Sequence, residues 1–163
     1  MSYLNKIKIL NKEEKKQIEE KLKEQFGINE ILGLLIESRT DRILLFQGNL
    51  NEKQIQKLER TLPIEKVGVY FATKIISENK IRLSIEGTQI LKGQIKKNIF
   101  ELNEQQAKEW MMGRELEIKT GKSDFLIMKY KDNFLGTGKA SELKIGNFIP
   151  KNRRLKNQET PSI

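Results

Sequence analysis

Three short motifs fix where the helices of this chain begin. Each is an asparagine followed three residues later by Glu or Gln: Asn11 with Glu14, Asn51 with Gln54, and Asn103 with Gln106. In such a capping box, each side chain accepts a hydrogen bond from a backbone N–H of the first helical turn that would otherwise lack a partner. The sequence therefore predicts helices over residues 11–26, 51–62 and 103–112.

Each predicted helix carries one apolar stripe that we expect to be buried. The stripes are Ile18, Leu22 and Phe26; Ile55, Leu58 and Leu62; and Ala107, Trp110 and Met111. Trp110 is the only tryptophan. An exposed tryptophan could stack on a nucleic-acid base, but its place beside Met111 favours a role in the core.

Apolar runs rich in β-branched and aromatic residues lie between the helices and predict strands. They cover residues 31–36, 42–46, 67–72 and 81–85, and then 98–102, 115–118, 125–130, 134–140 and 144–149, with a basic connector over 89–97. The first set, with two helices, predicts an α+β fold with a mostly antiparallel sheet. The second set, with one helix, predicts a small, partly closed β-barrel.

Charge is divided unevenly between these two parts. Residues 1–78 hold 14 basic and 12 acidic side chains, whereas residues 79–163 hold 17 and 10. Such an asymmetry indicates two parts with different roles. We expect a first domain over residues 1–92, a second over 93–155, and a flexible polar tail over 156–163.

The composition excludes many functions. The chain has no cysteine and no histidine, so thiolate metal sites, cysteine nucleophiles and the commonest general base are excluded. We expect no catalytic residue, no metal site and no cofactor. No run of eighteen apolar residues and no secretory signal occur, which predicts a cytoplasmic protein without a membrane partner.

The net charge of +9 favours a polyanionic partner. Basic side chains are frequent near the C-terminus and in the loop that follows the third predicted helix. If strands bring half of them to one face, they form a patch suited to a phosphate backbone. The alternative is a solvated lysine-rich surface that binds nothing.

Two segments resemble a known RNA-binding domain. Phe125–Lys139, an apolar strand, a short acidic turn and a return strand with a Gly-x-Gly element, resembles the hairpin of a PUA domain. This domain is named for pseudouridine synthases and archaeosine transglycosylases. Lys144–Leu155 is similar to the ending of the PUA region in Fmu/Sun-type RNA cytosine-5 methyltransferases, with Asn147, Pro150, Lys151 and Arg154 in the matching places.

The order of the two parts also resembles a known layout. Nip-type large-subunit assembly factors of archaea and eukaryotes carry a helix-led α/β domain, called pre-PUA, before a PUA barrel. The runs Val67–Thr73 and Ile81–Thr88 are similar to the strand pair that ends that first domain. Sun-type enzymes carry a catalytic cysteine and a cofactor-binding domain, for which this chain has neither the residue nor the length.

The resemblance implies RNA binding without catalysis, in ribosomal RNA maturation or large-subunit assembly. Phosphate contacts are expected from eight cations: Arg114, Lys119, Lys122, Lys139, Lys144, Lys151, Arg153 and Arg154. Asn147 could bond a base or a 2′-hydroxyl, or it could shape a turn. The RNA would be ribosomal or transfer RNA. The alternatives are an accessory subunit of an RNA-modification enzyme and an adaptor that binds assembly or modification proteins.

Overall fold

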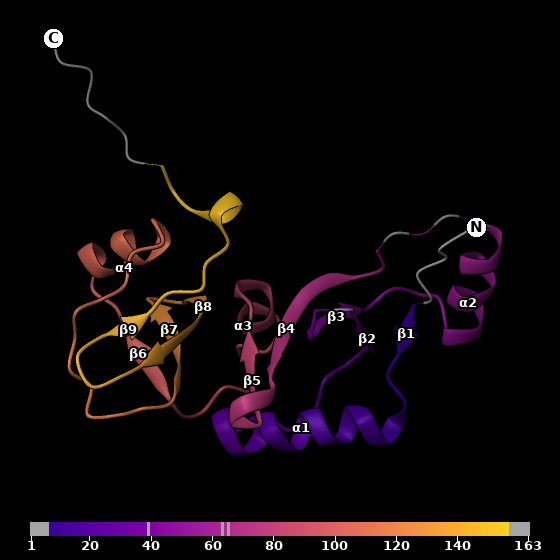
Figure 1. Cartoon of the computed structure of the whole chain (residues 1–163), viewed down its shortest axis with the longest axis horizontal. Helices are drawn as coiled ribbons and strands as arrows, with labels where there is room; N and C mark the ends of the chain where they lie inside the picture. The colour runs from indigo at the N-terminus through magenta and orange to yellow at the C-terminus, as the bar shows by residue number, and fades with distance from the viewer. Residues whose placement is uncertain (1–6, 39, 63, 65, 157–163) are drawn as a thin grey trace, which may run out of the picture.

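The computed structural model describes residues 7–38, 40–62, 64 and 66–156. The first half contains β1 (Lys8–Ile9), α1 (Lys12–Phe26), β2 (Leu34–Glu37), β3 (Arg42–Phe46), α2 (Glu52–Thr61), β4 (Val69–Ile75), η1 (Ile76–Glu78), β5 (Lys80–Leu83) and α3 (Ile85–Ile90). The second half contains β6 (Ile99–Glu101), α4 (Glu104–Met111), β7 (Phe125–Tyr130), β8 (Asn133–Ala140), β9 (Ile145–Gly146) and η2 (Lys151–Arg153). The expected α+β class is confirmed (Figure 1).

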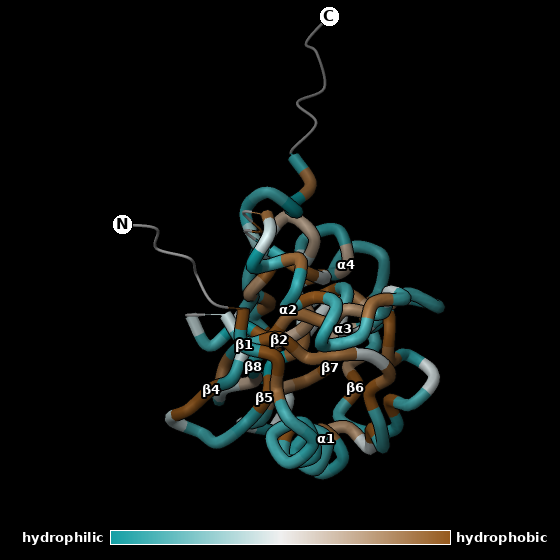
Figure 2. Tube along the Cα trace, turned by 90° about the vertical axis from the view of Figure 1, so that its right-hand side faces the viewer, coloured by the Kyte–Doolittle hydropathy of each residue, from teal (hydrophilic) through white to brown (hydrophobic). Residues whose placement is uncertain are grey.

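The first half is built on one antiparallel sheet. Its strands follow the order β1-β2-β3-β4-β5, and every neighbouring pair is antiparallel. Helix α1 runs along one side of this sheet (Figure 1) and buries Ile18, Leu22 and Phe26 in the core, as its stripe predicts. Figure 2 shows the same separation by hydropathy, with apolar strand segments inside and a mostly hydrophilic α1 outside.

All three predicted capping boxes are present. The side chains of Asn11, Asn51 and Asn103 each accept a hydrogen bond from the backbone N–H of the residue three positions later, and their own backbone N–H donates to the side chain of that residue. Helix α1 ends at Gly27, whose φ of +78° places it in the left-handed region that glycine adopts without strain. The predicted helix starts are confirmed because each one depends on two residues only three positions apart in the sequence.

The expected buried stripe of α2 is wrong. Ile55 is buried, but Leu58 is 37% and Leu62 is 54% exposed. Helix α2 lies at the outer end of the first sheet (Figure 1), so only one of its turns reaches the core. The spacing of apolar residues alone does not reveal how much of α2 the sheet can cover.

Helix α3 is absent from the sequence-based expectation, which continues the strand through Ile85. In the structure β5 ends at Leu83, and the Ser84 hydroxyl accepts from Gly87 N at 3.0 Å and donates to Tyr70 O at 2.7 Å. Ser84 thereby caps α3 and fixes it to β4. A Cβ at Gly87 would lie 2.3 Å from Phe71 O, so glycine is what lets the helix approach the strand.

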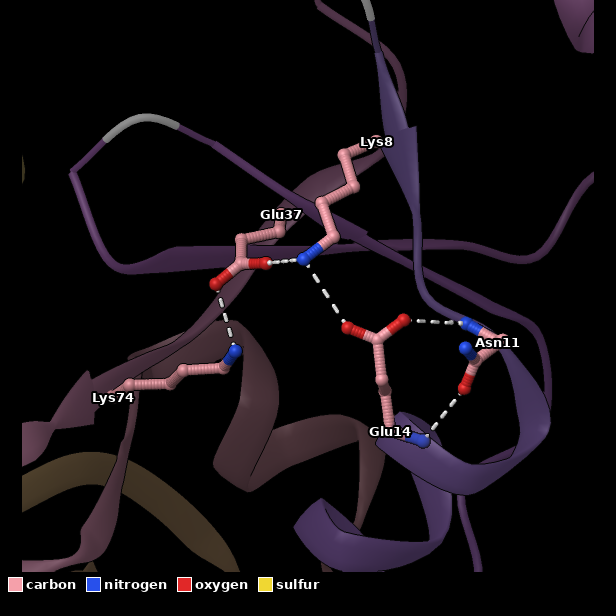
Figure 3. A network of polar contacts seen from close by, with 5 residues as sticks. All are labelled: Lys8, Asn11, Glu14, Glu37 and Lys74. Carbon is pink, nitrogen blue, oxygen red and sulfur yellow. Dashed lines mark hydrogen bonds and ion pairs between the residues drawn. The ribbon is translucent and has the colours of Figure 1, made fainter.

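A network of ion pairs holds the edge strand β1 (Figure 3). Lys8 Nζ lies 2.8 Å from Glu37 Oε2 and 3.1 Å from Glu14 Oε2, and Lys74 Nζ lies 2.7 Å from Glu37 Oε1. The hydrogen bond to Glu37 raises the pKa of Lys8, and a hydrogen bond from Asn11 lowers the pKa of Glu14. Burial raises the pKa of Glu37, but the hydrogen bonds and charges of Lys74 and Lys8 outweigh it and hold that pKa below its usual value.

The second half is a curled sheet of the order β6-β7-β8-β9, covered by α4. The β6–β7 pair is parallel and the other two pairs are antiparallel. The strand expected over 115–118 is reduced to a single bridge between Leu116 and Ile145. The expected small barrel with one helix is thus present as a half-barrel.

The two halves share a hydrophobic core. Phe125, Ile127 and Phe134 of the second sheet belong to the same buried cluster as Phe26 and Phe71 of the first half. Within the described residues, three ion pairs also join the halves: Glu78 with Lys139 at 2.6 Å, Lys80 with Asp124, and Glu86 with Arg153. A domain boundary at residue 92 stays a prediction.

The connector between the halves is fixed to the end of α1. Gln94 Oε1 accepts from Asn29 N at 3.0 Å and from Glu30 N at 3.1 Å, and Gln94 Nε2 donates to Glu30 O at 2.9 Å. Lys96 N donates to Phe26 O at 2.9 Å, and Asn98 Nδ2 donates to Gln25 O at 2.6 Å. The connector therefore belongs to the packed structure and is not a free linker.

Candidate nucleic-acid interface

The Gly-x-Gly element of β8 has a packing role. Gly136 has a φ of +81°, and a Cβ at Gly138 would lie 2.5 Å from Ile145 Cγ2 and 2.9 Å from the Trp110 ring. Trp110 is fully buried, and its Nε1 donates to Leu135 O at 2.8 Å. The tryptophan is therefore a core residue, and the absence of a side chain at Gly138 leaves room for its ring.

Asn147 fixes the segment after β9 to the end of α4. Its Nδ2 donates to Trp110 O at 2.8 Å and to Arg114 O at 2.9 Å, and its Oδ1 accepts from Ile149 N at 2.8 Å. Both amide hydrogens are used within the fold. Of the two roles that the sequence left open for Asn147, the geometry favours shaping the turn.

Arg154 is also held by the protein itself. Its Nε donates to Ile149 O at 3.0 Å, and its side chain lies across Gly113, where a Cβ would be only 2.2 Å from that nitrogen. The next residue, Leu155, donates its N–H to Met111 O at 2.8 Å. The C-terminal turn, residues 147–155, is thereby closed onto α4. The tail expected over 156–163 lies, apart from Lys156, outside the described residues.

The predicted cations fall into three groups. Arg114, Lys151, Arg153 and Arg154 belong to the C-terminal turn and the end of α4 beneath it. Lys119 and Lys144 line one shallow hollow with Glu117 and Glu142, and Lys122 and Lys139 lie near Asp124. The loops after α4 and β8 lie below α4 in Figure 1, whereas η2 lies above α3. The structure therefore does not join all eight cations in one strip.

Ion pairing separates these cations further. Lys139, Lys144 and Arg153 pair with Glu78, Glu115 and Glu86. The other predicted cations form no carboxylate pair within the part of the chain that the structure describes: Arg114, Lys119, Lys122, Lys151 and Arg154. A phosphate can approach this second set without displacing a carboxylate.

Sequence reasoning missed a cleft between the two halves. Its volume is about 350 Å³, and it is bordered by β4, β5, α3, β8 and the C-terminal turn. The residues that give it chemical character are Arg42, Tyr70, Arg82, Thr137, Phe148 and Arg153. They come from five separate segments of the sequence, so no local pattern indicates the cleft.

Guanidinium groups lie on aromatic rings at this cleft. Arg42 Cζ lies 5.0 Å from the centre of the Tyr70 ring, and Arg82 Cζ lies 4.1 Å from the centre of the Phe148 ring. The second pair joins the two halves. Such stacking orients the planar guanidinium and leaves its N–H groups available to an anion.

The sequence gives one partial signal for the cleft. Tyr70 and Phe71 are neighbours in a strand, so one must face inward and the other outward. Phe71 is fully buried, whereas Tyr70 is half-buried and lines the cleft. Alternation predicts that one aromatic residue is available, but it does not tell which one.

Two further observations concern other classes of site. Within the described residues, no group of three or more Asp and Glu side chains is placed to hold a metal ion. No helix in that same part of the chain is long and apolar enough to cross a membrane.

Comparison with known protein families gives a match to part of the second half. The family described as the methyltransferase RsmF PUA domain matches residues 97–155, which include the curled sheet, α4 and the C-terminal turn. No curated protein matches the chain significantly. The family match supports RNA binding in general. Residues 97–155 are thus a PUA domain that resembles the PUA region of Fmu/Sun-type RNA methyltransferases.

Proposed function

We propose that this chain is a non-catalytic protein that binds structured RNA through its PUA domain and acts in ribosomal RNA maturation or large-subunit assembly. One observation carries the proposal: the PUA domain holds exposed cations that no described carboxylate neutralises. They include Arg114, Lys119, Lys122 and Lys151.

The mechanism is electrostatic positioning. Each cation that contacts a phosphate releases condensed counterions, so affinity falls as salt rises. The five cations that pair with no described carboxylate, the four above and Arg154, would give a slope of log K against log salt of about −4. The non-catalytic part of the proposal rests on composition, since the chain lacks histidine and cysteine.

The assembly role is supported by the order of the two halves. A helix-led α+β unit precedes the PUA domain, as in Nip-type factors, and the two units share a core. The second candidate is an accessory subunit that supplies RNA binding to a separate modification enzyme. It is favoured by the matched family, which is a domain of a methyltransferase.

Crosslinking in the native cell extract, followed by sequencing of the recovered RNA, tests the proposal. Enrichment of one segment of large-subunit ribosomal RNA supports the assembly role, and enrichment of transfer RNA supports the accessory-subunit role. Recovery of no RNA above background would contradict both and leave an adaptor that binds proteins.

A variant with Lys119→Glu and Lys122→Glu is the matched control for this experiment. Both side chains are exposed and neither forms an ion pair with a described carboxylate. Their reversal should therefore leave the fold intact and remove most of the recovered RNA.

A further inference from the structure

We propose that the cleft between the two halves binds one unpaired nucleotide of the RNA that the PUA domain holds. This inference rests on the proposed RNA-binding function. It adds a second contact region, formed jointly by the first sheet and the C-terminal turn.

Charge at the cleft favours a phosphate. Among the described residues, four cations line it, Arg42, Lys66, Arg82 and Arg153, against one carboxylate, Glu86. Glu86 is already paired with Arg153. Arg42 and Arg82 form no carboxylate pair within the described residues, so their guanidinium groups can bind an anion bidentately.

The aromatic rings favour a base beside that phosphate. Unpaired RNA bases are recognised by stacking on aromatic rings and on guanidinium planes. The cleft presents both surfaces together, in the Arg42–Tyr70 pair and in the Arg82–Phe148 pair. Phe148 is 41% exposed, so part of its side chain is accessible to a ligand.

The volume of the cleft and its lining residue Thr137 agree with an unpaired nucleotide as the ligand. About 350 Å³ is at the lower end of the range for small-ligand sites and is too small for a folded element. Thr137 lines the cleft and is 4% exposed, yet its hydroxyl has no hydrogen-bond partner in the described structure. Buried polar groups are almost always paired, so this hydroxyl is a group that a ligand can satisfy.

The cleft is continuous with the PUA surface. Phe148, Pro150 and Arg153 border the cleft, and Lys151, which is exposed, lies among them in the same turn. A strand of RNA held by phosphate contacts at Lys151 therefore leads directly to the cleft. This continuity favours RNA over an acidic peptide as the occupant.

Two labelled RNAs test the proposal by fluorescence anisotropy with the full chain. One is a blunt hairpin, and the other is the same hairpin with a single-stranded 3′ extension of about six nucleotides. We expect the extended hairpin to bind about tenfold more tightly, because one stacked base contributes roughly that factor. Arg82→Ala and Phe148→Ala should each remove this preference and leave binding of the blunt hairpin within about twofold.

Further variants distinguish a loss of the binding preference from a loss of folding. Arg82→Lys keeps the charge but loses the planar group, so it should lose most of the preference while the melting temperature stays near that of the wild type. Lys16→Ala on the exposed face of α1 should change neither affinity. With 4-thiouridine in the extension, photocrosslinks should map to peptides that contain Tyr70 or Phe148.

The outcomes separate this inference from the proposed function. Equal binding of the two RNAs by the wild type, or a preference that survives Arg82→Ala and Phe148→Ala, would overturn the cleft proposal alone. Failure of the wild type to bind either RNA would overturn the proposed function. Competition by poly-glutamate as effective as by poly-uridylate would show that the cleft takes an acidic peptide, which also overturns the inference.

Discussion

The C-terminal turn and the α4–β7 loop, residues 112–124, each hold three of the predicted cations, yet they use them differently. In the turn, Arg153 pairs with Glu86, and Arg154 is bonded to Ile149 O and packed on Gly113. In the loop, Lys119 and Lys122 are exposed and form no ion pair with a described carboxylate. These two arginines of the turn therefore support the fold, whereas the two lysines of the loop remain available to a ligand.

Two glycines give the sharpest test of this difference. Gly113 and Gly121 both have positive φ, +85° and +71°, but a Cβ at Gly113 meets the Arg154 side chain and a Cβ at Gly121 meets nothing within 4 Å. We expect Gly113→Ala to lower the free energy of unfolding by about 3 kcal/mol, through backbone strain plus steric overlap. Gly121→Ala should cost about 1 kcal/mol, from strain alone. Urea denaturation measures both, and equal losses would mean that Arg154 is not packed on Gly113.

Substitutions of Asn147 test how much its hydrogen bonds contribute to the stability of the turn. Asn147→Asp replaces two N–H donors with a carboxylate that faces the Trp110 and Arg114 carbonyls, so we expect a loss of about 2 to 3 kcal/mol. Asn147→Ala should cost about 2 kcal/mol. If the remaining folded protein kept its RNA affinity, the side chain would be confirmed as a positioning residue. A loss of affinity without loss of stability would instead assign it to RNA contact.

Charge reversal compares the two regions directly. Lys119→Glu with Lys122→Glu should lower RNA affinity at least tenfold, reduce the salt slope by about 2, and leave the melting temperature unchanged. Arg153→Glu with Arg154→Glu should lower the melting temperature, because both side chains bond other parts of the fold. Anisotropy and thermal melts on both variants measure the two effects. A stable turn variant would remove the distinction between the regions.

Lowering the pH has the smallest expected effect on the free energy of unfolding. It extends the comparison to the first sheet. The pKa of Glu37 is held below its usual value in the folded chain, so the unfolded chain binds more protons as the pH falls. The stability from this group is complete above its ordinary pKa and is lost as pH falls through the lowered one. Glu37→Gln should flatten that part of the stability profile, measured by urea denaturation at a series of pH values. RNA affinity should stay constant between about pH 6 and 8, since the chain has no histidine.

Local sequence patterns predict much of the fold but little of the ligand-binding surface. The capping boxes and the hairpin of β7 and β8 are confirmed because a few neighbouring residues determine them. Helix α3 is missed because its cap, Ser84, bonds to β4 across the sheet. The alternating run that precedes it is equally compatible with a longer strand.

The roles of the cations are unpredictable for a similar reason. The carboxylates that neutralise Lys139 and Arg153 are 61 and 67 residues away in the sequence. Only the folded structure brings Glu78 and Glu86 to them. The cleft likewise depends on the placement of β4, β5 and the C-terminal turn around one space, so no motif marks it.

The bonds that fix the connector to α1 have a consequence for how RNA is selected. Gln94, Lys96 and Asn98 attach the connector to the end of α1, and the shared core prevents the halves from turning about it. The distance from the cations of the α4–β7 loop to the cleft is therefore constant. If the cleft binds an unpaired nucleotide as proposed, the protein selects an RNA by the distance between that nucleotide and the folded stem, and each base pair added or deleted between them weakens binding.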